Sequence, residues 1–409
     1  MHPLIHDWNT IGLPPPPARV LLNDETLRDG LQSPSVTTPN IDRKIEILHL
    51  IEALGIDSVD IGLPGAGPHV LRDVECLAKE IVKSKLQVRP NCAARTKISD
   101  IKPIVEISQR VGVPIECCPF IGSSAIRHYT EGWSLDQLLG YTEESISFAV
   151  REGLPVMYVT EDATRADPET LRQLCTTAIR AGASRVCIAD TVGHAIPSGA
   201  RAVVRFVAQI AAESGDEVGI DWHGHRDRDL AVVNSLAALE AGATRVHATA
   251  LGIGERVGNT PMELLLVNLV LLGWVEQDLS RLMEYCRAVA ETCGVQIPAN
   301  HAVVGEDAFR TATGVHAAAV LKAFHKSDLD LADAVYSGVP AGLVGRKQVI
   351  DVGPMSGRSN VVGWLERHGV TVTEERVDRV LAGAKSSSRV LSDSEIDVLI
   401  SAEPGEGSG

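Results

Sequence analysis

Short apolar runs alternate with longer amphipathic stretches along most of the chain. A near-continuous run of Val, Ile and Leu is typical of a parallel strand that is buried on both faces. Helical stretches follow these runs, and several end at a glycine, the residue that commonly follows a helix. The strand-like runs cover residues 20–23, 58–61, 86–89, 114–120, 155–159, 185–189, 218–222 and 245–249, and the helical stretches include 41–54, 135–152, 168–181 and 229–241.

Eight strand–helix units in roughly 250 residues match the size of a (β/α)8 TIM barrel, which is an α/β fold. The alternative is a doubly wound open sheet, but the count of eight strands and their even spacing favour the barrel. No G-x-G-x-x-G follows the first strand, so a Rossmann dinucleotide site is not indicated. We expect a lead-in over residues 1–18, the barrel as the catalytic domain over 19–275, a smaller, mainly helical C-terminal region over 276–400 and a disordered tail over 401–409.

The charge and the apolar content argue against two classes of partner. The 409 residues carry a formal net charge of −15, whereas a nucleic-acid-binding protein needs a basic footprint. The N-terminus lacks the features of a signal peptide, and the longest apolar stretch, residues 264–275, is too short to cross a bilayer. The eight cysteines form no C-x-x-C pair. We therefore expect a cytoplasmic protein with reduced core cysteines, no nucleic-acid partner and no membrane partner.

Polar residues follow seven of the eight predicted strands. In a TIM barrel the loops at the carboxyl ends of the strands share one mouth, where the chemistry takes place. A single acid there is most often a cap or half of a salt bridge, but seven strand ends together indicate an active site. We expect substrate-binding residues among them. The polar positions include Asp24, Glu25, Arg28, Asp29 and Gln32 after the first strand, Arg89 after the third, Ser123 after the fourth, Glu161 after the fifth, Thr191 after the sixth, His223 and His225 after the seventh and Asn259 after the eighth.

The pair His223 and His225 suggests a metal site. Residues i and i+2 of a strand point to the same side, so both rings can face one ion. With an acid from the first strand they make three protein ligands with open positions, which is the ligand count of a catalytic metal. Carboxylate and imidazole ligands suit Mg2+, Mn2+ or Zn2+. The spacing alone does not choose among Asp24, Glu25 and Asp29 as the acid.

Six motifs of the chain resemble those of the isopropylmalate synthase and homocitrate synthase family, which belongs to the DRE-TIM metallolyases. The resemblance runs from residue 20 to residue 370, with the motifs in the same order as in the family. The motifs are LRDG at 27–30, EDATR at 161–165, DTVG at 190–193, HGH at 223–225, GIGERVGN at 252–259 and GVH at 314–316.

This resemblance implies a metal-dependent Claisen condensation of acetyl-CoA with a 2-oxo acid, followed by hydrolysis of the thioester to give a 2-substituted malate and CoA. It implies a divalent metal ion (Mg2+, Mn2+ or Zn2+), acetyl-CoA as cosubstrate, and a homodimer or larger homo-oligomer in which His316 completes the neighbour's site. The implied metal ligands are Asp29, His223 and His225 with Asn259 as a further contact, and the implied catalytic residues are Arg28, Glu161, His316 and Tyr336. Thr191 is expected to line the substrate pocket beside Glu161, and Gln32, Arg89 and Ser123 complete the substrate-binding residues that we expect.

Departures from the family pattern suggest a specialised member. Arg226 and Asp229 stand where the family usually has Asn and Gly. In homocitrate synthases, an Arg four residues before the glutamate that matches Glu161 and a His after the second strand hold the distal carboxylate of 2-oxoglutarate. Met157 and Leu63 occupy those places here. The sequence therefore favours a 2-oxo acid with an apolar side chain.

Two other classes of protein remain possible from the sequence. One is a carbon–carbon lyase on the same barrel, of the hydroxymethylglutaryl-CoA lyase or aldolase kind. The first of these lyases carries a reactive cysteine on a glycine-rich loop, and no cysteine lies between Gly252 and Pro261. The other is a non-catalytic metal-binding or scaffold protein. Since each proposed catalytic position is filled by a competent residue, the synthase is the preferred interpretation.

Overall fold

The computed structural model describes residues 2–12 and 15–401. The chain divides into two compact units, of which one comprises residues 13–297 and the other residues 1–12 together with 298–409. The predicted C-terminal tail, 401–409, lies outside the described residues except for Ser401. No helix in the described parts of the chain is both long and apolar enough to cross a membrane.

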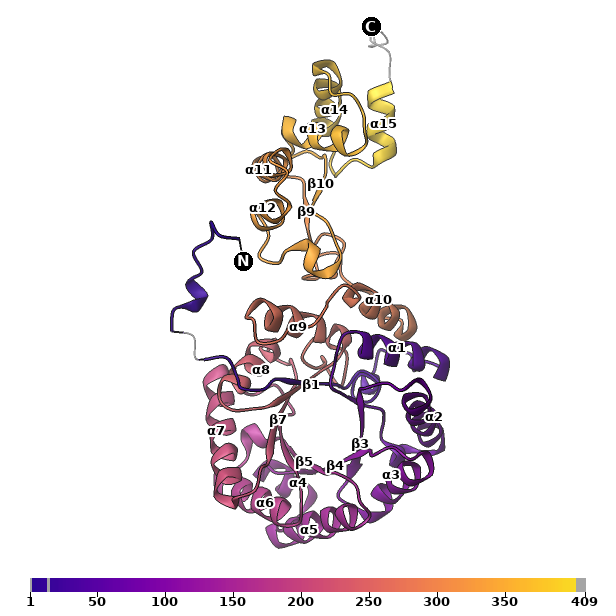
Figure 1. Ribbon diagram of the computed structural model, residues 1–409, viewed down its shortest axis with the longest axis vertical. Helices are drawn as coiled ribbons and strands as arrows, with labels where there is room; N and C mark the ends of the chain where they lie inside the picture. The colour runs from indigo at the N-terminus through magenta and orange to yellow at the C-terminus, as the bar shows by residue number, and fades with distance from the viewer. Residues whose placement is uncertain (1, 13–14, 402–409) are drawn as a thin grey trace. The chain divides into compact units, whose positions relative to one another are not determined.

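The first unit is a closed barrel of eight parallel strands that follow one another in sequence order (Figure 1), which confirms the predicted TIM barrel. Leu21 of the first strand pairs with Arg245 of the last and closes the barrel. Nearly all strand residues are buried, as expected where helices cover the outside and side chains fill the inside. The strands are β1 (Leu21–Asp24), β2 (Ser58–Asp60), β3 (Arg89–Arg95), β4 (Glu116–Gly122), β5 (Met157–Glu161), β6 (Arg185–Asp190), β7 (Gly219–Gly224) and β8 (Arg245–Ala248).

The helices of this unit surround the barrel (Figure 1), and local signals in the sequence fix their ends. Ser134 and Gln137 form a reciprocal capping box at the start of α5, and Asp167 accepts two backbone N–H groups at the start of α6. The helices are α1 (Ile41–Ala53), α2 (Pro68–Ser84), α3 (Ile98–Val111), α4 (Ala125–Glu131), α5 (Leu135–Arg151), α6 (Pro168–Arg180), α7 (Pro197–Ser214), α8 (Ala231–Glu240), α9 (Met262–Leu271) and α10 (Leu282–Cys293).

The third strand differs from its predicted position. The apolar run at residues 86–89 predicts the strand there, but β3 begins at Arg89 and continues to Arg95. Its buried centre contains Cys92, Ala93 and Ala94, and such small residues give a weak strand signal compared with Val or Ile. Arg89 therefore lies at the amino end of β3, at the opposite end of the strand from the mouth of the barrel.

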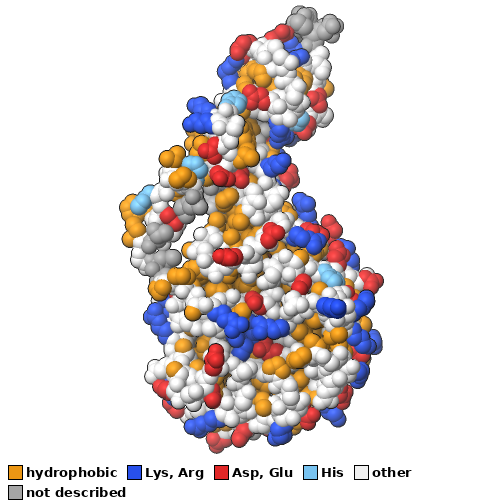
Figure 2. All heavy atoms as spheres, viewed as in Figure 1, with side chains coloured by type: hydrophobic (Ala, Val, Ile, Leu, Met, Phe, Trp, Pro, Cys, Tyr) orange, Lys and Arg blue, Asp and Glu red, His pale blue; other side chains and the backbone are white. Residues whose placement is uncertain are grey.

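Buried ion pairs fill the amino-terminal end of the barrel. Asp221, which is fully buried, accepts hydrogen bonds from Arg185 and Arg245, at 2.6 Å and 2.5 Å. Arg245 also reaches Glu116 at 2.6 Å. A cavity at this end is lined by these arginines and by Arg89, and Figure 2 shows Lys and Arg side chains gathered near the middle of the barrel. Removing one member of these ion pairs would destabilise the fold, because its partner would remain as a buried charge without a counter-ion.

The second unit is mainly helical, with a two-stranded parallel sheet between β9 (Arg310–Thr311) and β10 (Val349–Ile350). Its apolar core includes Trp364, Leu365 and Val380. The expected boundary at residues 275–276 differs from the observed division, because α10 packs on α1 and belongs with the barrel. The helices of this unit are α11 (Gly314–His325), α12 (Leu329–Ala334), α13 (Arg358–Arg367), α14 (Glu374–Ser386) and α15 (Asp393–Ser401).

Candidate metal centre and active site

The carboxyl ends of β1 and β7 bring together Asp29, His223 and His225. Asp29 Oδ2 lies 3.2 Å from His223 Nε2 and 3.6 Å from His225 Nε2. The two Nε2 atoms are 3.3 Å apart. Asp29 and the two histidines are at most 8% exposed. One atom from each residue therefore faces a common point in a nearly water-free position.

This spacing fits a divalent cation. Ligand atoms that bind one ion at about 2.1 Å lie roughly 3.0–3.4 Å from one another in octahedral or tetrahedral geometry. The two Nε2 atoms lie within hydrogen-bonding distance of each other, and with both unprotonated each would offer a lone pair to a cation placed between them. Among the described residues, this trio is one of two groups of histidine and acidic side chains close enough to share an ion.

The charge states of Asp29 and His225 suit metal binding. Burial opposes ionisation of Asp29, but Arg28 and His223 outweigh it and hold the pKa of Asp29 well below its usual range. Burial and the neighbouring His223 lower the pKa of His225 to about 4. A carboxylate and a neutral imidazole are the forms that bind metals at neutral pH.

The structure distinguishes the three candidate acids. Asp24 belongs to neither group of possible metal ligands, and its side chain accepts hydrogen bonds from Tyr285 of α10 and from the backbone of Thr26. Burial raises the pKa of Asp24 to about 6. Glu25 faces the opposite nitrogen of His223, at 3.8 Å from Nδ1. Only Asp29 faces Nε2 of both histidines, so it is the acid of our proposed metal site.

Asn259 lies beside the trio. It forms an isolated β-bridge with His225, and its Nδ2 donates to the carbonyl of Ile253 at 3.2 Å. Its Oδ1 is buried and accepts no hydrogen bond from the described residues. Gly254 allows this position, because a Cβ there would lie 2.1 Å from Asn259 Nδ2. An unused buried oxygen next to His225 keeps Asn259 a candidate for the further metal contact.

Arg28 is held by acidic side chains on several sides. Its Nε donates to Asp60 Oδ2 at 2.8 Å, its Nη2 donates to Glu25, and its Nη1 lies 3.6 Å from Asp29. The guanidinium is fixed next to the metal ligand and lines the cavity. Because guanidinium stays charged at all relevant pH values, it suits stabilisation of negative charge rather than proton abstraction.

The cavity above the trio has a volume of about 190 Å3, with a polar and an apolar side. The polar side includes Arg28, Gln32, Glu161 and Thr191 of the predicted substrate and catalytic residues. The apolar side is formed by side chains of β3, β4 and β5 and of the loop after β2, namely Leu63, Ala93, Cys118, Phe120, Met157 and Val159. A ligand held at the metal by polar groups would therefore extend its other end over apolar side chains.

Glu161 and Thr191 occupy neighbouring strand ends. Glu161 closes β5, and its Oε1 forms an ion pair with Arg127 Nε at 2.9 Å. Thr191 follows β6, and its hydroxyl accepts the backbone N–H of Asp162 at 2.8 Å. Both side chains line the cavity.

Two expected substrate-binding residues do not line the cavity. The hydroxyl of Ser123 is buried and donates to the carbonyl of Glu161 at 2.7 Å, so it links β4 to β5. Arg89 begins β3 and lines the cavity at the amino-terminal end of the barrel. Its expected place at the carboxyl-end mouth was based on ending the third strand too early. Neither residue therefore belongs to the proposed site.

His316 and Tyr336 belong to the second unit. His316 lies in the first turn of α11, and Tyr336 follows α12. Their rings stack with centroids 4.0 Å apart, and Tyr336 is half exposed. The two residues, which are distant in sequence from the barrel motifs, are therefore neighbours of each other.

Arg226 and Asp229, the departures after the second histidine, form an ion pair at 2.8 Å. Asp229 has a φ of 56°, a left-handed conformation that favours Gly but that Asp tolerates better than most residues. The ion pair connects the two ends of one tight turn. In this turn the backbone N–H of Asp229 donates to the carbonyl of Arg226 at 2.7 Å.

Sequence reasoning missed Asp60 and His247. Asp60 ends β2, lines the cavity and accepts from Arg28. Burial raises the pKa of Asp60, and the nearby charge of Glu25 raises it further, although Arg28 acts in the opposite direction. His247 in β8 lies 2.9 Å from carboxylates on both sides, Glu25 and Asp221. The position of Asp60 at a strand end was an available signal, whereas nothing in the local pattern distinguishes His247, inside an apolar strand, from a core histidine.

Comparisons with known proteins agree with this geometry. Residues 19–289 match the family described as HMGL-like. A protein named homocitrate synthase AksA from Methanopyrus kandleri is 34% identical over 391 residues, which cover 94% of this chain and 92% of that protein. A probable 2-isopropylmalate synthase from the same organism is 32% identical over 373 residues, covering 90% of this chain and 70% of that protein.

Solved structures support the fold. The HMG-CoA lyase from Bacillus subtilis superposes with a TM-score of 0.58 at 22% identity, covering 69% of this chain and 97% of the lyase chain. At that identity the likeness concerns the barrel alone. The family match and the relatives confirm the resemblance drawn from the motifs, and the chain belongs to the HMGL-like family.

Proposed function

We propose that this protein catalyses the metal-dependent condensation of acetyl-CoA with a 2-oxo acid, followed by hydrolysis of the thioester. The observation that carries the proposal is the set of three ligand atoms, on Asp29, His223 and His225, within 3.6 Å of one another at the mouth of a cavity that also holds Arg28. The relatives named as isopropylmalate and homocitrate synthases support it. The lyase alternative is less supported, because the likeness to lyases is one of fold.

A divalent metal bound by Asp29, His223 and His225 would polarise the keto group of a chelating 2-oxo acid. Arg28 is placed to stabilise the oxygen that gains negative charge when the new carbon–carbon bond forms. We propose His316 of a neighbouring copy as the base that takes a proton from the thioester methyl group, with Tyr336 beside it and with Glu161 of the barrel orienting its ring. Gln32 and Thr191 would hold the substrate at the polar side of the cavity. Water then cleaves the thioester, which releases the CoA thiol and leaves a carboxylate.

The apolar side of the cavity points to the side chain of the 2-oxo acid. Among the described lining residues the arginines are Arg28, held by Glu25 and Asp60, and Arg256, held by Asp227. Met157 and Leu63 add no charge. A distal carboxylate would thus be buried without a free cation, which is costly.

We expect 2-oxo acids with apolar side chains to be preferred over 2-oxoglutarate by at least about tenfold in kcat/KM. The measurement is thiol release from acetyl-CoA with a panel of 2-oxo acids of both kinds, at saturating Mg2+ or Mn2+. A reaction without added 2-oxo acid is the control for simple thioester hydrolysis. Preference for a dicarboxylic 2-oxo acid would refute the assignment of the apolar side.

We also propose a homodimer or larger homo-oligomer in which His316 acts in the site of a neighbouring copy. His316→Ala and Arg28→Ala are each expected to be inactive alone, because each lacks one group of the same site. After subunit exchange, each mixed dimer contains one site with both intact groups, Arg28 from one copy and His316 from the other. We therefore expect the mixture to regain about a quarter to a half of the wild-type activity. Persistent inactivity of mixed subunits that sedimentation shows to have exchanged would contradict the shared site.

A further inference from the structure

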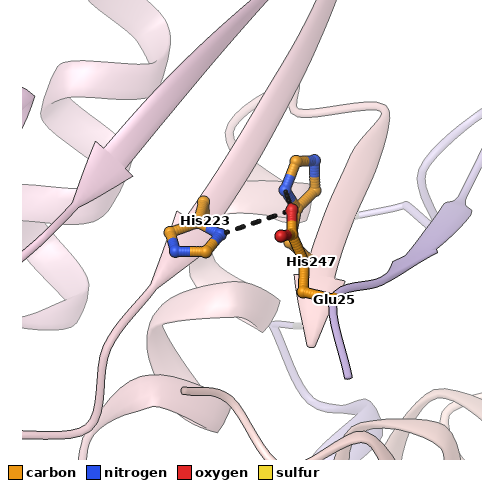
Figure 3. A group of neighbouring side chains, drawn as sticks. All are labelled: Glu25, His223 and His247. Carbon is orange, nitrogen blue, oxygen red and sulfur yellow. Dashed lines mark ion pairs between the residues drawn. The ribbon is translucent and has the colours of Figure 1, made fainter. Parts of the chain in front are cut away.

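The fully buried carboxylate of Glu25 faces the metal ligand His223 from the side opposite to Asp29. His223 Nε2 lies 3.2 Å from Asp29, and its Nδ1 lies 3.8 Å from Glu25 Oε1. Figure 3 shows His223 and His247 directed toward the same carboxylate group. The two nitrogens of His223 therefore have separate surroundings, one facing the proposed metal point and one facing Glu25.

Glu25 is itself held in place by two hydrogen-bond donors and by one nearby histidine. Asn23 Nδ2 donates to its Oε1 at 3.0 Å, and Arg28 Nη2 donates to its Oε2. His247 Nδ1 lies 2.9 Å from Oε1, at an ion-pair distance whose angle does not make a hydrogen bond. The side chain of Glu25 is 2% exposed, so it cannot turn toward water. Its carboxylate is thus a fixed acceptor between the histidine ligand and Arg28.

His247 lies between Glu25 and Asp221 and links these two carboxylates. Its Nε2 bonds with Asp221 Oδ2 at 2.9 Å, and Asp221 is held by Arg185 and Arg245. Glu25, His223 and His247 also have the spacing of a metal site. However, both ring nitrogens of His247 already face carboxylates, and His223 offers its other nitrogen to Asp29. The group is therefore better suited to holding His223 than to binding a second ion.

We propose that Glu25 is a positioning residue that fixes His223 with Nδ1 protonated and Nε2 free for the metal, and that ties this ligand to Arg28. A histidine ligand commonly donates its second N–H to a carboxylate, which sets its tautomer and its basicity. The gap of 3.8 Å is longer than a hydrogen bond, so the proposal requires the ring of His223 to move toward Glu25 when the metal binds. The proposal rests on the metal site of the proposed function but not on the reaction.

The test measures metal affinity in the absence of substrates. Metal-stripped protein is titrated with Zn2+ or Mn2+ against a chelating dye, and the melting temperature is recorded for each variant. Glu25→Gln is expected to weaken metal binding by about 10–100-fold, the usual effect of losing such a carboxylate. Glu25→Asp keeps the charge but places it one methylene farther from His223, so we expect a smaller loss of metal affinity. This second variant keeps the test informative if Glu25→Gln fails to fold.

Asp100→Asn is the matched control. Asp100 is also a buried carboxylate in an ion pair, with Arg95 at 2.6 Å, near the end of another barrel strand. Its loss is expected to lower the melting temperature while leaving metal affinity unchanged. Nitrogen-15 spectra of histidine-labelled wild-type protein are expected to show His223 protonated at Nδ1.

Metal affinities of Glu25→Gln and Glu25→Asp within about threefold of wild type, below the range expected for a lost carboxylate partner, would overturn the proposal. So would a His223 protonated at Nε2 in the metal-loaded protein. Since no substrate is present, these outcomes are distinct from a failure of the proposed condensation, which would leave the metal affinities as expected.

Discussion

Removing the metal with a chelator is expected to abolish acetyl-CoA-dependent condensation, by at least about 10³-fold, because polarising the keto group is worth several kcal/mol. Mg2+, Mn2+ or Zn2+ added back in excess should restore the activity. His223→Ala is expected to reproduce the loss permanently and to weaken metal binding, since it removes one of the three ligand atoms that lie 3.2–3.6 Å apart.

His49→Ala is the control for this substitution. His49 is a partly exposed histidine on α1 whose ring nitrogen pairs with Glu80 at 2.9 Å, away from the strand ends. Its replacement should leave both metal content and kcat unchanged. Full activity in protein shown to contain less than one metal per hundred sites would contradict the proposed metal site.

Replacing Arg28 is expected to lower kcat per bound metal by about 10²–10³-fold, the usual effect of removing one group that stabilises a developing oxyanion. Arg28→Lys should restore little of it, because a single ammonium cannot contact Glu25, Asp60 and the substrate oxygen together. Activity, metal content and melting temperature are measured on the same preparation.

The contacts of Arg28 also predict a loss of stability, since Glu25 and Asp60 would remain buried without their cation. Arg95→Ala separates this effect from catalysis, because it removes the partner of buried Asp100 in the same way. If the two variants lose stability alike and kcat per bound metal is unchanged in Arg28→Ala, then Arg28 holds the first loop and takes no part in the reaction.

Periodicity predicted the part of the site that lies on regular strands. His223 and His225 share a side of β7 because side chains alternate along a strand, and Asp29 follows the strand that pairs with β8. The barrel itself followed from eight apolar runs. The choice of Asp29 over Asp24 was not available from spacing, because it depends on Tyr285, which is more than 250 residues away and donates a hydrogen bond to Asp24.

Contacts between distant strands explain what the sequence did not reveal. The weak strand signal of Cys92–Ala94 displaced the predicted third strand, and with it the expected role of Arg89. The hydroxyl of Ser123 could bind a substrate, but it donates its hydrogen bond to the backbone of the neighbouring strand instead. Asp60 contributes to the site by pairing with Arg28, and His247 does so by pairing with Glu25. These pairs form only when the barrel closes, so no local sequence pattern reveals them.

The most direct test of the proposed reaction follows a labelled acetyl group. Acetyl-CoA carrying carbon-13 in the methyl group is incubated with an apolar 2-oxo acid and the metal-loaded protein, and the products are identified by NMR and mass spectrometry. We predict that the label appears in a new methylene group of a 2-substituted malate, together with one equivalent of free CoA, and that chelator prevents both. Label found only in free acetate, or a product formed equally well by metal-stripped protein, would contradict the proposed reaction.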